Sequence, residues 1–154
     1  MAAYFFDSSA AVKRYSNETG TNWVKGIADP AAGNKIYIAL ITGAEVVSAI
    51  ARKARSGGLS AIDASRAIAD FRLDFTSVYR TVEVTFDLIK KAMEIAEKHT
   101  LRGYDAVQLA VALGVNVYWL NLGMPALTLV SADADLNTAA LTEGLAVEDP
   151  NDHP

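Results

Sequence analysis

Short apolar segments alternate with longer amphipathic segments along the whole of this 154-residue chain. The apolar segments are short and rich in β-branched or aromatic residues, and lie at 3–6, 36–40, 78–84, 126–130 and 145–147. Apolar residues recur at helical spacing between them, at about 9–16, 20–28, 42–56, 61–75, 86–98, 104–113 and 133–141. Strands this short and apolar are typical of a sheet covered on both faces. The alternation predicts an α/β fold, a three-layer α/β/α sandwich with a mostly parallel central sheet.

Several polar residues predict where individual helices begin. Ser60 and Thr85 stand directly before helical patterns, and Thr42 opens a capping box in which Glu45 reaches back to the first backbone amides. The helix that starts near Tyr104 either ends at Gly114 or continues towards residue 122. We expect one domain over residues 1–148 and a polar C-terminal tail over 149–154.

Composition excludes several classes of site and protein. The chain has no cysteine, which rules out disulfides, thiolate-bound metals and a cysteine nucleophile. Residues 106–132 carry no charged side chain, but Gly, Asn and Pro interrupt them, which favours a buried helix, a turn and a strand over a membrane span. The N-terminus lacks the basic start of a secretory signal. We therefore expect a cytoplasmic protein that does not contact a membrane.

Charge is distributed unevenly along the chain. All 14 Lys and Arg residues lie within residues 1–102, whereas residues 103–154 contain seven Asp and Glu residues. The formal net charge of −4 is not typical of a nucleic-acid-binding protein. A function that involves nucleic acid therefore needs either a local basic surface or bound metal ions.

Acidic residues follow several of the predicted strands. Asp7 comes after the first strand, Glu45 begins the helix after the second, and Asp105 begins the helix after Gly103. Asp133 follows the fourth strand, with Asp135 two residues later. If the strands are parallel, these residues meet at one edge of the sheet, where ligands bind in such folds. Crowded carboxylates need compensation, and Mg²⁺ or Mn²⁺ supplies it with the oxygen ligands that such ions prefer.

Each acidic residue alone has a simpler interpretation. Carboxylates near helix starts stabilise the first turn, and Glu45 fits a capping box. The functional hypothesis depends on the joint placement of these residues. Lys13, Arg14 and Arg52 are candidate contacts for a substrate backbone, although a solvated helix face explains Arg52 equally well.

Four ordered blocks resemble one known family: Tyr4–Tyr15, Thr42–Ile50, Leu101–Ala110 and Leu129–Leu136. They are similar to the corresponding segments of PIN-domain ribonucleases, especially VapC-type toxins of bacterial toxin–antitoxin pairs. The resemblance covers nearly the whole chain. It implies an α/β/α sandwich and a metal-dependent endoribonuclease that uses Mg²⁺ or Mn²⁺.

The resemblance also implies roles for individual residues. Asp7, Glu45, Asp105 and Asp133 match the family's acidic quartet, with Asp7, Asp105 and Asp133 as metal ligands and Glu45 either binding a metal-bound water or orienting the attacking one. Ser9 and Ser131 match supporting polar positions, and Asp135 matches an outer acid that could replace Asp133 as ligand. A homodimer and a small antitoxin partner are implied as well.

Two features depart from the family pattern or leave alternatives open. The interval between Asp105 and Asp133 is longer than is common, with residues 119–125 inserted near the expected cleft. An aspartyl-nucleophile phosphatase would need an Asp two residues after Asp7, where the chain has Ser9. A catalytically silent PIN-like module that binds RNA or protein, and a structural domain whose acids only cap helices, remain as alternatives.

Overall fold

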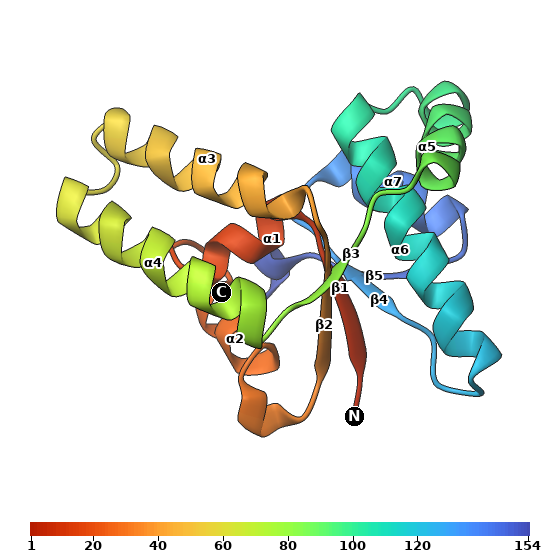
Figure 1. Ribbon diagram of the computed structural model, residues 1–154, viewed down its shortest axis with the longest axis horizontal. Helices are drawn as coiled ribbons and strands as arrows, with labels where there is room; N and C mark the ends of the chain where they lie inside the picture. Colours follow the sequence, from red (N-terminus) through yellow and green to blue (C-terminus); the bar gives the residue numbers. More distant parts are fainter.

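Five parallel strands lie between two layers of helices in the computed structural model, which describes all residues 1–154 (Figure 1). The strands are β1 (Ala3–Phe6), β2 (Lys35–Ala39), β3 (Arg80–Val82), β4 (Thr128–Val130) and β5 (Ala146–Glu148). They are ordered β3-β2-β1-β4-β5, and every neighbouring pair is parallel. The predicted α/β/α sandwich is therefore confirmed.

Seven α-helices and three short 3₁₀ helices connect the strands. The α-helices are α1 (Ser8–Ala11), α2 (Thr21–Ile27), α3 (Thr42–Arg55), α4 (Ala61–Ser77), α5 (Phe86–His99), α6 (Gly103–Asn121) and α7 (Ala134–Thr142). The 3₁₀ helices are η1 (Val12–Arg14), η2 (Pro30–Ala32) and η3 (Pro150–Asp152). Ser60 and Thr85 cap α4 and α5 as predicted, each accepting a hydrogen bond from the backbone three residues later.

The sheet separates two hydrophobic cores because successive strand residues face opposite sides. In β1, Phe5 packs with residues of α5, α6 and α7, whereas Phe6 packs with residues of α1, α2, α3 and α4. Figure 1 shows these two helical groups on either side of the sheet. Leu129 and Val130 of β4 divide between the two cores in the same way. Burial on both faces explains why the strands are so apolar.

The strand order brings the ends of β1 and β4 together. β1 has β2 on one side and β4 on the other, so the direction in which the chain crosses the sheet reverses between β1 and β4. In parallel α/β sheets the ligand-binding crevice forms at this reversal, beyond the carboxyl ends of the strands. Asp7 follows β1 and Ser131 follows β4 at this point.

Two predicted elements are shorter than expected. The helix predicted over 9–16 is a single α-helical turn, α1, followed by η1, whose tighter i→i+3 bonding ends with Tyr15 N donating to Val12 O. The strand predicted over 78–84 forms only between Arg80 and Val82. β3 is an edge strand, and its register with β2 covers only three residues.

The segment without charged residues forms a helix and a strand, as predicted. α6 continues through Gly114 to Asn121, which resolves the alternative that the sequence left open. A Cβ at Gly114 would meet only a side-chain atom of Leu88 at an ordinary contact distance, so the helix has room to pass there. None of the helices combines the length and the apolar character that crossing a membrane requires.

The predicted capping box at the start of α3 is wrong. Ile41, not Thr42, is the N-cap, and no side chain caps this helix. The Thr42 hydroxyl and the Glu45 carboxylate both accept hydrogen bonds from the Gln108 side chain instead. Tertiary contact with α6 has replaced the local bonds that the sequence spacing predicted.

The last residues, 149–154, which the sequence predicted as a polar tail, pack against the domain. Pro150 is buried, and Asp149 caps η3 by accepting from Asn151 N at 2.8 Å. The His153 ring stacks on Trp23 with 4.1 Å between ring centroids and 4° between planes. These contacts fasten the chain after β5 to α2.

Candidate active site at the carboxyl edge of the sheet

Asp7 is a buried carboxylate at the end of β1. It is 3% exposed, and its Oδ1 accepts a hydrogen bond from Ala10 N at 3.0 Å, so it also caps α1. The Ser9 hydroxyl lies 2.7 Å from Oδ1 and 2.9 Å from Oδ2 of Asp7. Ser131 donates to Oδ2 at 2.9 Å from the neighbouring strand end. The helix-cap interpretation of Asp7 is thus correct but incomplete.

Burial controls the protonation of Asp7. Removal from water raises the pKa of this carboxyl to about 6. Hydrogen bonds from Ser9, Ala10 and Ser131 act in the opposite direction, and the negative charge of Asp105 raises the pKa further. A cation at this carboxylate would favour its charged form, which the protein alone disfavours.

The two predicted serines connect the acidic residues to each other. Ser131 donates to Asp7 and accepts from Asp133 N at 3.0 Å. Ser9 accepts from Ala132 N at 2.9 Å, which ties the end of β1 to the loop before α7. Asp133 caps α7 by accepting from Leu136 N at 2.9 Å. These bonds hold Asp7 and Asp133 in one rigid unit.

A cleft of about 710 Å³ lies beside this unit and is lined by Glu45, Asp105 and Asp133. Asp105 is half-buried, and its pKa is raised first by burial and next by the charge of Asp133. Glu45 and Asp135 raise the pKa of Asp105 further, whereas Arg102 lowers it. This electrostatic interaction shows that acids far apart in sequence lie near one another.

Asp133 and Asp135 occupy different environments. Asp133 is half-buried and lines the cleft, whereas Asp135 is exposed on α7 and is absent from the cleft wall. The charge of Asp135 nevertheless affects Asp105. This arrangement supports Asp133 as the fourth member of the quartet and an outer position for Asp135.

The cleft suits a hard divalent cation, because the acidic side chains that line it offer carboxylate oxygens as metal ligands. The carboxylates do not already form a ligand cage: nowhere in the chain are three His, Cys, Asp or Glu side chains grouped closely enough to hold an ion. Asp7 uses both oxygens for hydroxyl and amide donors. The chemistry of these oxygen donors therefore fits a divalent metal, although the carboxylates are not already grouped around one point.

Two arginines, Arg52 and Arg102, line the same cleft as the acids. Arg52 was a candidate substrate contact from the sequence, and the structure leaves it exposed on α3. Arg102 precedes α6 and is also exposed. Both arginines therefore share the wall of the cleft with Glu45, Asp105 and Asp133.

Lys13 and Arg14, the other two candidate substrate contacts, already have partners within the protein. Lys13 is 5% exposed and donates to Glu18, to the Thr19 carbonyl and to Asn151. Arg14 donates to the Ala28 carbonyl and pairs with Asp74. Both residues follow Asp7 closely in sequence, but Lys13 is buried and Arg14 is half-buried, and neither lines the cleft of the carboxylates.

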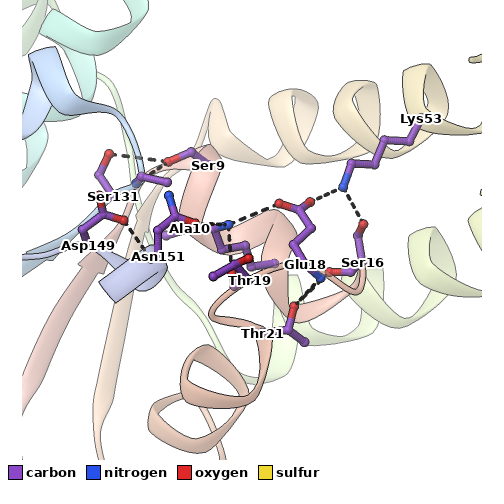
Figure 2. A network of polar contacts seen from close by, with 12 residues as sticks. Ser9, Ala10, Ser16, Glu18, Thr19, Thr21, Lys53, Ser131, Asp149 and Asn151 are labelled. Atoms are coloured by element: carbon purple, nitrogen blue, oxygen red, sulfur yellow. Dashed lines mark hydrogen bonds and ion pairs between the residues drawn. The ribbon is translucent and has the colours of Figure 1, made fainter. Parts of the chain in front are cut away.

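Glu18 is the centre of the polar network shown in Figure 2. It accepts from Lys53 of α3 as well as from Lys13. Burial alone would raise the pKa of the Glu18 carboxyl, but the two lysines outweigh it and hold the pKa below its ordinary value. Lys13 also reaches Asn151 at 3.0 Å. The network joins η1, α3 and the C-terminal segment.

We expect Lys13→Met to destabilise the fold by about 2 kcal/mol, because it removes the three hydrogen bonds that the buried Lys13 ammonium donates to Glu18, the Thr19 carbonyl and Asn151. Glu18 keeps Lys53, which limits the loss. Urea unfolding measures the difference, and Lys25→Met on the exposed side of α2 is the matched control, with a change below about 0.5 kcal/mol. Equal stabilities of the two variants would contradict a buried role for Lys13.

Sequence reasoning missed Gln108, Thr42 and Arg102. Gln108 is a polar residue among Val107, Leu109 and Ala110 in a buried helix, and that anomaly could have indicated it. No comparable local signal marks Arg102, because an exposed arginine before a helix is ordinary. Its importance comes only from the cleft that forms around it.

Comparisons with known proteins agree with this geometry. The family model described as the PIN domain matches residues 4–140. Two Mycobacterium tuberculosis proteins, Ribonuclease VapC45 and Ribonuclease VapC49, are each 33% identical over 150 residues, covering 96% of this chain and 95% of theirs.

A solved structure shows the same fold. VapBC2 from Rickettsia felis, bound to a DNA fragment from their promoter, gives a TM-score of 0.63 at 14% identity and covers 96% of this chain and 98% of that chain. The five-stranded parallel sheet, the acidic residues at its carboxyl edge and the match over residues 4–140 lead to one conclusion. The chain belongs to the PIN-domain family and is similar to VapC ribonucleases.

Proposed function

We propose that this protein is a metal-dependent endoribonuclease and the toxin of a toxin–antitoxin pair. One observation carries the proposal: Glu45, Asp105 and Asp133 line one cleft beside buried Asp7, in a chain 33% identical to named ribonucleases. A silent PIN-like module would have no need to keep four carboxylates at this edge, because their mutual repulsion is unfavourable. The structural-domain alternative is weaker, since neither Glu45 nor Asp105 caps a helix.

The residues divide the work of phosphodiester hydrolysis. Asp7, Asp105 and Asp133 would hold Mg²⁺ or Mn²⁺, which supplies an activated water and neutralises charge on the scissile phosphate. Glu45, which lines the same cleft, would orient the attacking water. Ser9 and Ser131 keep Asp7 in place through their hydroxyl groups. Water would attack the phosphorus and the ribose 3′-oxygen would leave, so the products carry a 5′-phosphate and a 3′-hydroxyl.

The substrate contacts in this proposal come from arginine. Arg52 and Arg102 line the cleft and would bind phosphates on either side of the scissile bond. Substrate binding in this proposal depends on two local arginines and not on an overall positive charge, so it is compatible with the negative net charge of the chain. Recognition would depend on the shape and exposed bases of a single-stranded RNA region.

The test is cleavage of a structured RNA pool by purified, partner-free protein with Mn²⁺ and with EDTA. We expect metal-dependent cuts with 5′-phosphate ends. Cleavage that persists in EDTA would overturn metal dependence. A folded protein that neither cleaves RNA nor gains thermal stability from Mn²⁺ would instead support the silent module.

The proposed partner is a small antitoxin, supported by the similarity of this fold to VapBC2 from Rickettsia felis.

We also propose a homodimer. Phe86, Ile89 and Met93 form an exposed apolar stripe along α5 at helical spacing. Beside it an apolar groove of about 440 Å³ runs between α5 and α6 and reaches Tyr104. Exposed apolar surface of this kind is typical of protein interfaces.

We expect the wild-type protein to sediment as a dimer and Met93→Glu to sediment as a monomer, because a charge in the apolar groove must be desolvated on association. Analytical ultracentrifugation measures both. Leu73→Glu, at an equally exposed position on α4, is the control and stays dimeric. A monomeric wild-type protein at high concentration would contradict the proposed interface.

A further inference from the structure

A buried amide, Gln108, lies behind the cleft and contacts Glu45. Gln108 is on α6 three residues after Asp105, so both side chains project from the same face of the helix. It is 2% exposed. Its Nε2 lies 2.9 Å from Glu45 Oε1 and 2.9 Å from Thr42 Oγ1. α6 therefore carries Asp105 itself and contacts Glu45 through Gln108.

The chemistry of the partners determines how this amide is oriented. An ionised carboxylate can only accept hydrogen bonds, so the amino group of Gln108 must face Glu45. One amide hydrogen goes to Glu45 and the other to Thr42. The buried Oε1 of Gln108 has no hydrogen-bond partner within the chain, so this polar side chain is poorly explained by stability alone.

Glu45 depends on this contact for its orientation. The Glu45 side chain has three rotatable bonds and lines an open cleft. The hydrogen bond from Gln108 is the only one its carboxylate makes, and it forms no ion pair. Asp7 and Asp133, in contrast, are each held by backbone amides. Without Gln108, nothing within the chain fixes the direction of the Glu45 carboxylate.

We propose that Gln108 is a positioning residue that fixes the Glu45 carboxylate in the orientation needed to align the attacking water. The inference rests on the proposed ribonuclease function. It adds a residue outside the acidic quartet, because Gln108 itself lies behind the cleft and does not line it. Thr42 holds the second amide hydrogen and so prevents rotation of the amide group.

The test is a double-mutant cycle of Gln108→Met and Glu45→Gln. Methionine matches the length of glutamine but cannot donate a hydrogen bond. In single-turnover cleavage we expect Gln108→Met to lower the rate constant about 10- to 100-fold, as loss of a supporting partner does at metal sites, with little change in KM. In the Glu45→Gln background, Gln108→Met should change the rate less than about 2-fold, because the carboxylate that Gln108 positions is already absent.

A second readout is independent of activity. Crystal structures of the wild type and of Gln108→Met should show one Glu45 conformer in the former and a displaced or multiple conformer in the latter. Asn116→Leu is the matched control on α6: it removes the bond to Leu127 N far from the cleft and should leave the cleavage rate unchanged. It should cost stability comparable to Gln108→Met.

The outcomes separate this inference from the proposed function. Equal fold losses from Gln108→Met in the wild-type and Glu45→Gln backgrounds would show a merely structural role and overturn the inference. An unmoved Glu45 carboxylate in Gln108→Met would overturn it as well. A wild-type protein that cleaves no RNA would instead refute the ribonuclease, and the position of Glu45 in the two crystal structures would still decide the role of Gln108.

Discussion

Asp7→Asn should abolish RNA cleavage and at the same time make the metal-free protein more stable at neutral pH. The loss of activity follows from removing a carboxylate that the proposed metal needs. Charge stabilisation by a bound metal contributes several kcal/mol to the transition state, and each 1.36 kcal/mol is a factor of ten in rate. We therefore expect a rate reduction of about 10³-fold or more.

The gain in stability comes from the pKa of Asp7. Burial raises that pKa to about 6, above the ordinary value of 3.8 for an aspartate. The native state thus binds the proton more tightly than the unfolded state, and the free energy of unfolding falls as pH rises from about 4 to about 6. Above that range the charged Asp7 costs about 3 kcal/mol. Asparagine has the same shape without the charge and recovers much of this energy.

The measurement pairs cleavage assays with urea unfolding in EDTA at pH 5 and pH 8. The stability difference between Asp7→Asn and wild type should be larger at pH 8, where wild-type Asp7 is ionised. Asp63→Asn, at an exposed position in the first turn of α4, is the control and should alter neither activity nor the pH dependence. Near-wild-type cleavage by folded Asp7→Asn would refute the proposed active site, and lower stability at both pH values would refute the burial argument.

Gly20→Ala should destabilise the protein by about 2 to 4 kcal/mol. Gly20 has φ +84°, a left-handed conformation that costs alanine about 1 kcal/mol. A Cβ at this position would also overlap the carbonyl group of Pro150. Overpacking of this kind adds about 1 to 3 kcal/mol. The substitution must therefore displace η3, which carries the Asn151 contact to Lys13.

Gly26→Ala is the matched control for this prediction. Gly26 lies inside α2, has ordinary helical geometry and has no other atom near the position of an added Cβ. Alanine favours helix by up to about 1 kcal/mol relative to glycine, so this variant should be neutral or more stable. Urea unfolding of both variants decides the question, and similar stabilities would show that the C-terminal segment is not held against Gly20.

Local patterns in the sequence predicted most of the fold. The alternation of strands and helices and the caps at Ser60 and Thr85 follow from rules that act within a few residues. The placement of Asp7 and Asp133 after strands was also predictable. A parallel sheet brings such positions to one edge, whatever the details of packing.

Where the predictions failed, a distant contact replaced a local one. Thr42 and Glu45 matched a capping box, but both bind Gln108, which lies more than 60 residues away in sequence. Lys13 was expected at the surface and instead joins Glu18 to Asn151. Residues 149–154 were expected as a tail because they are polar, and their packing depends on Gly20 and Trp23.

The sequence by itself determined the fold class and the identities of the acidic residues, because hydrophobic periodicity and the positions of strand ends are local properties. Only the tertiary structure decided which Lys and Arg side chains are free to contact a substrate and which residue holds Glu45. The partners of a polar side chain are set by which elements pack together. In this protein the Gln108 side chain of α6 reaches the start of α3, so Glu45, a predicted site residue, is held by a distant helix and not by a local capping box.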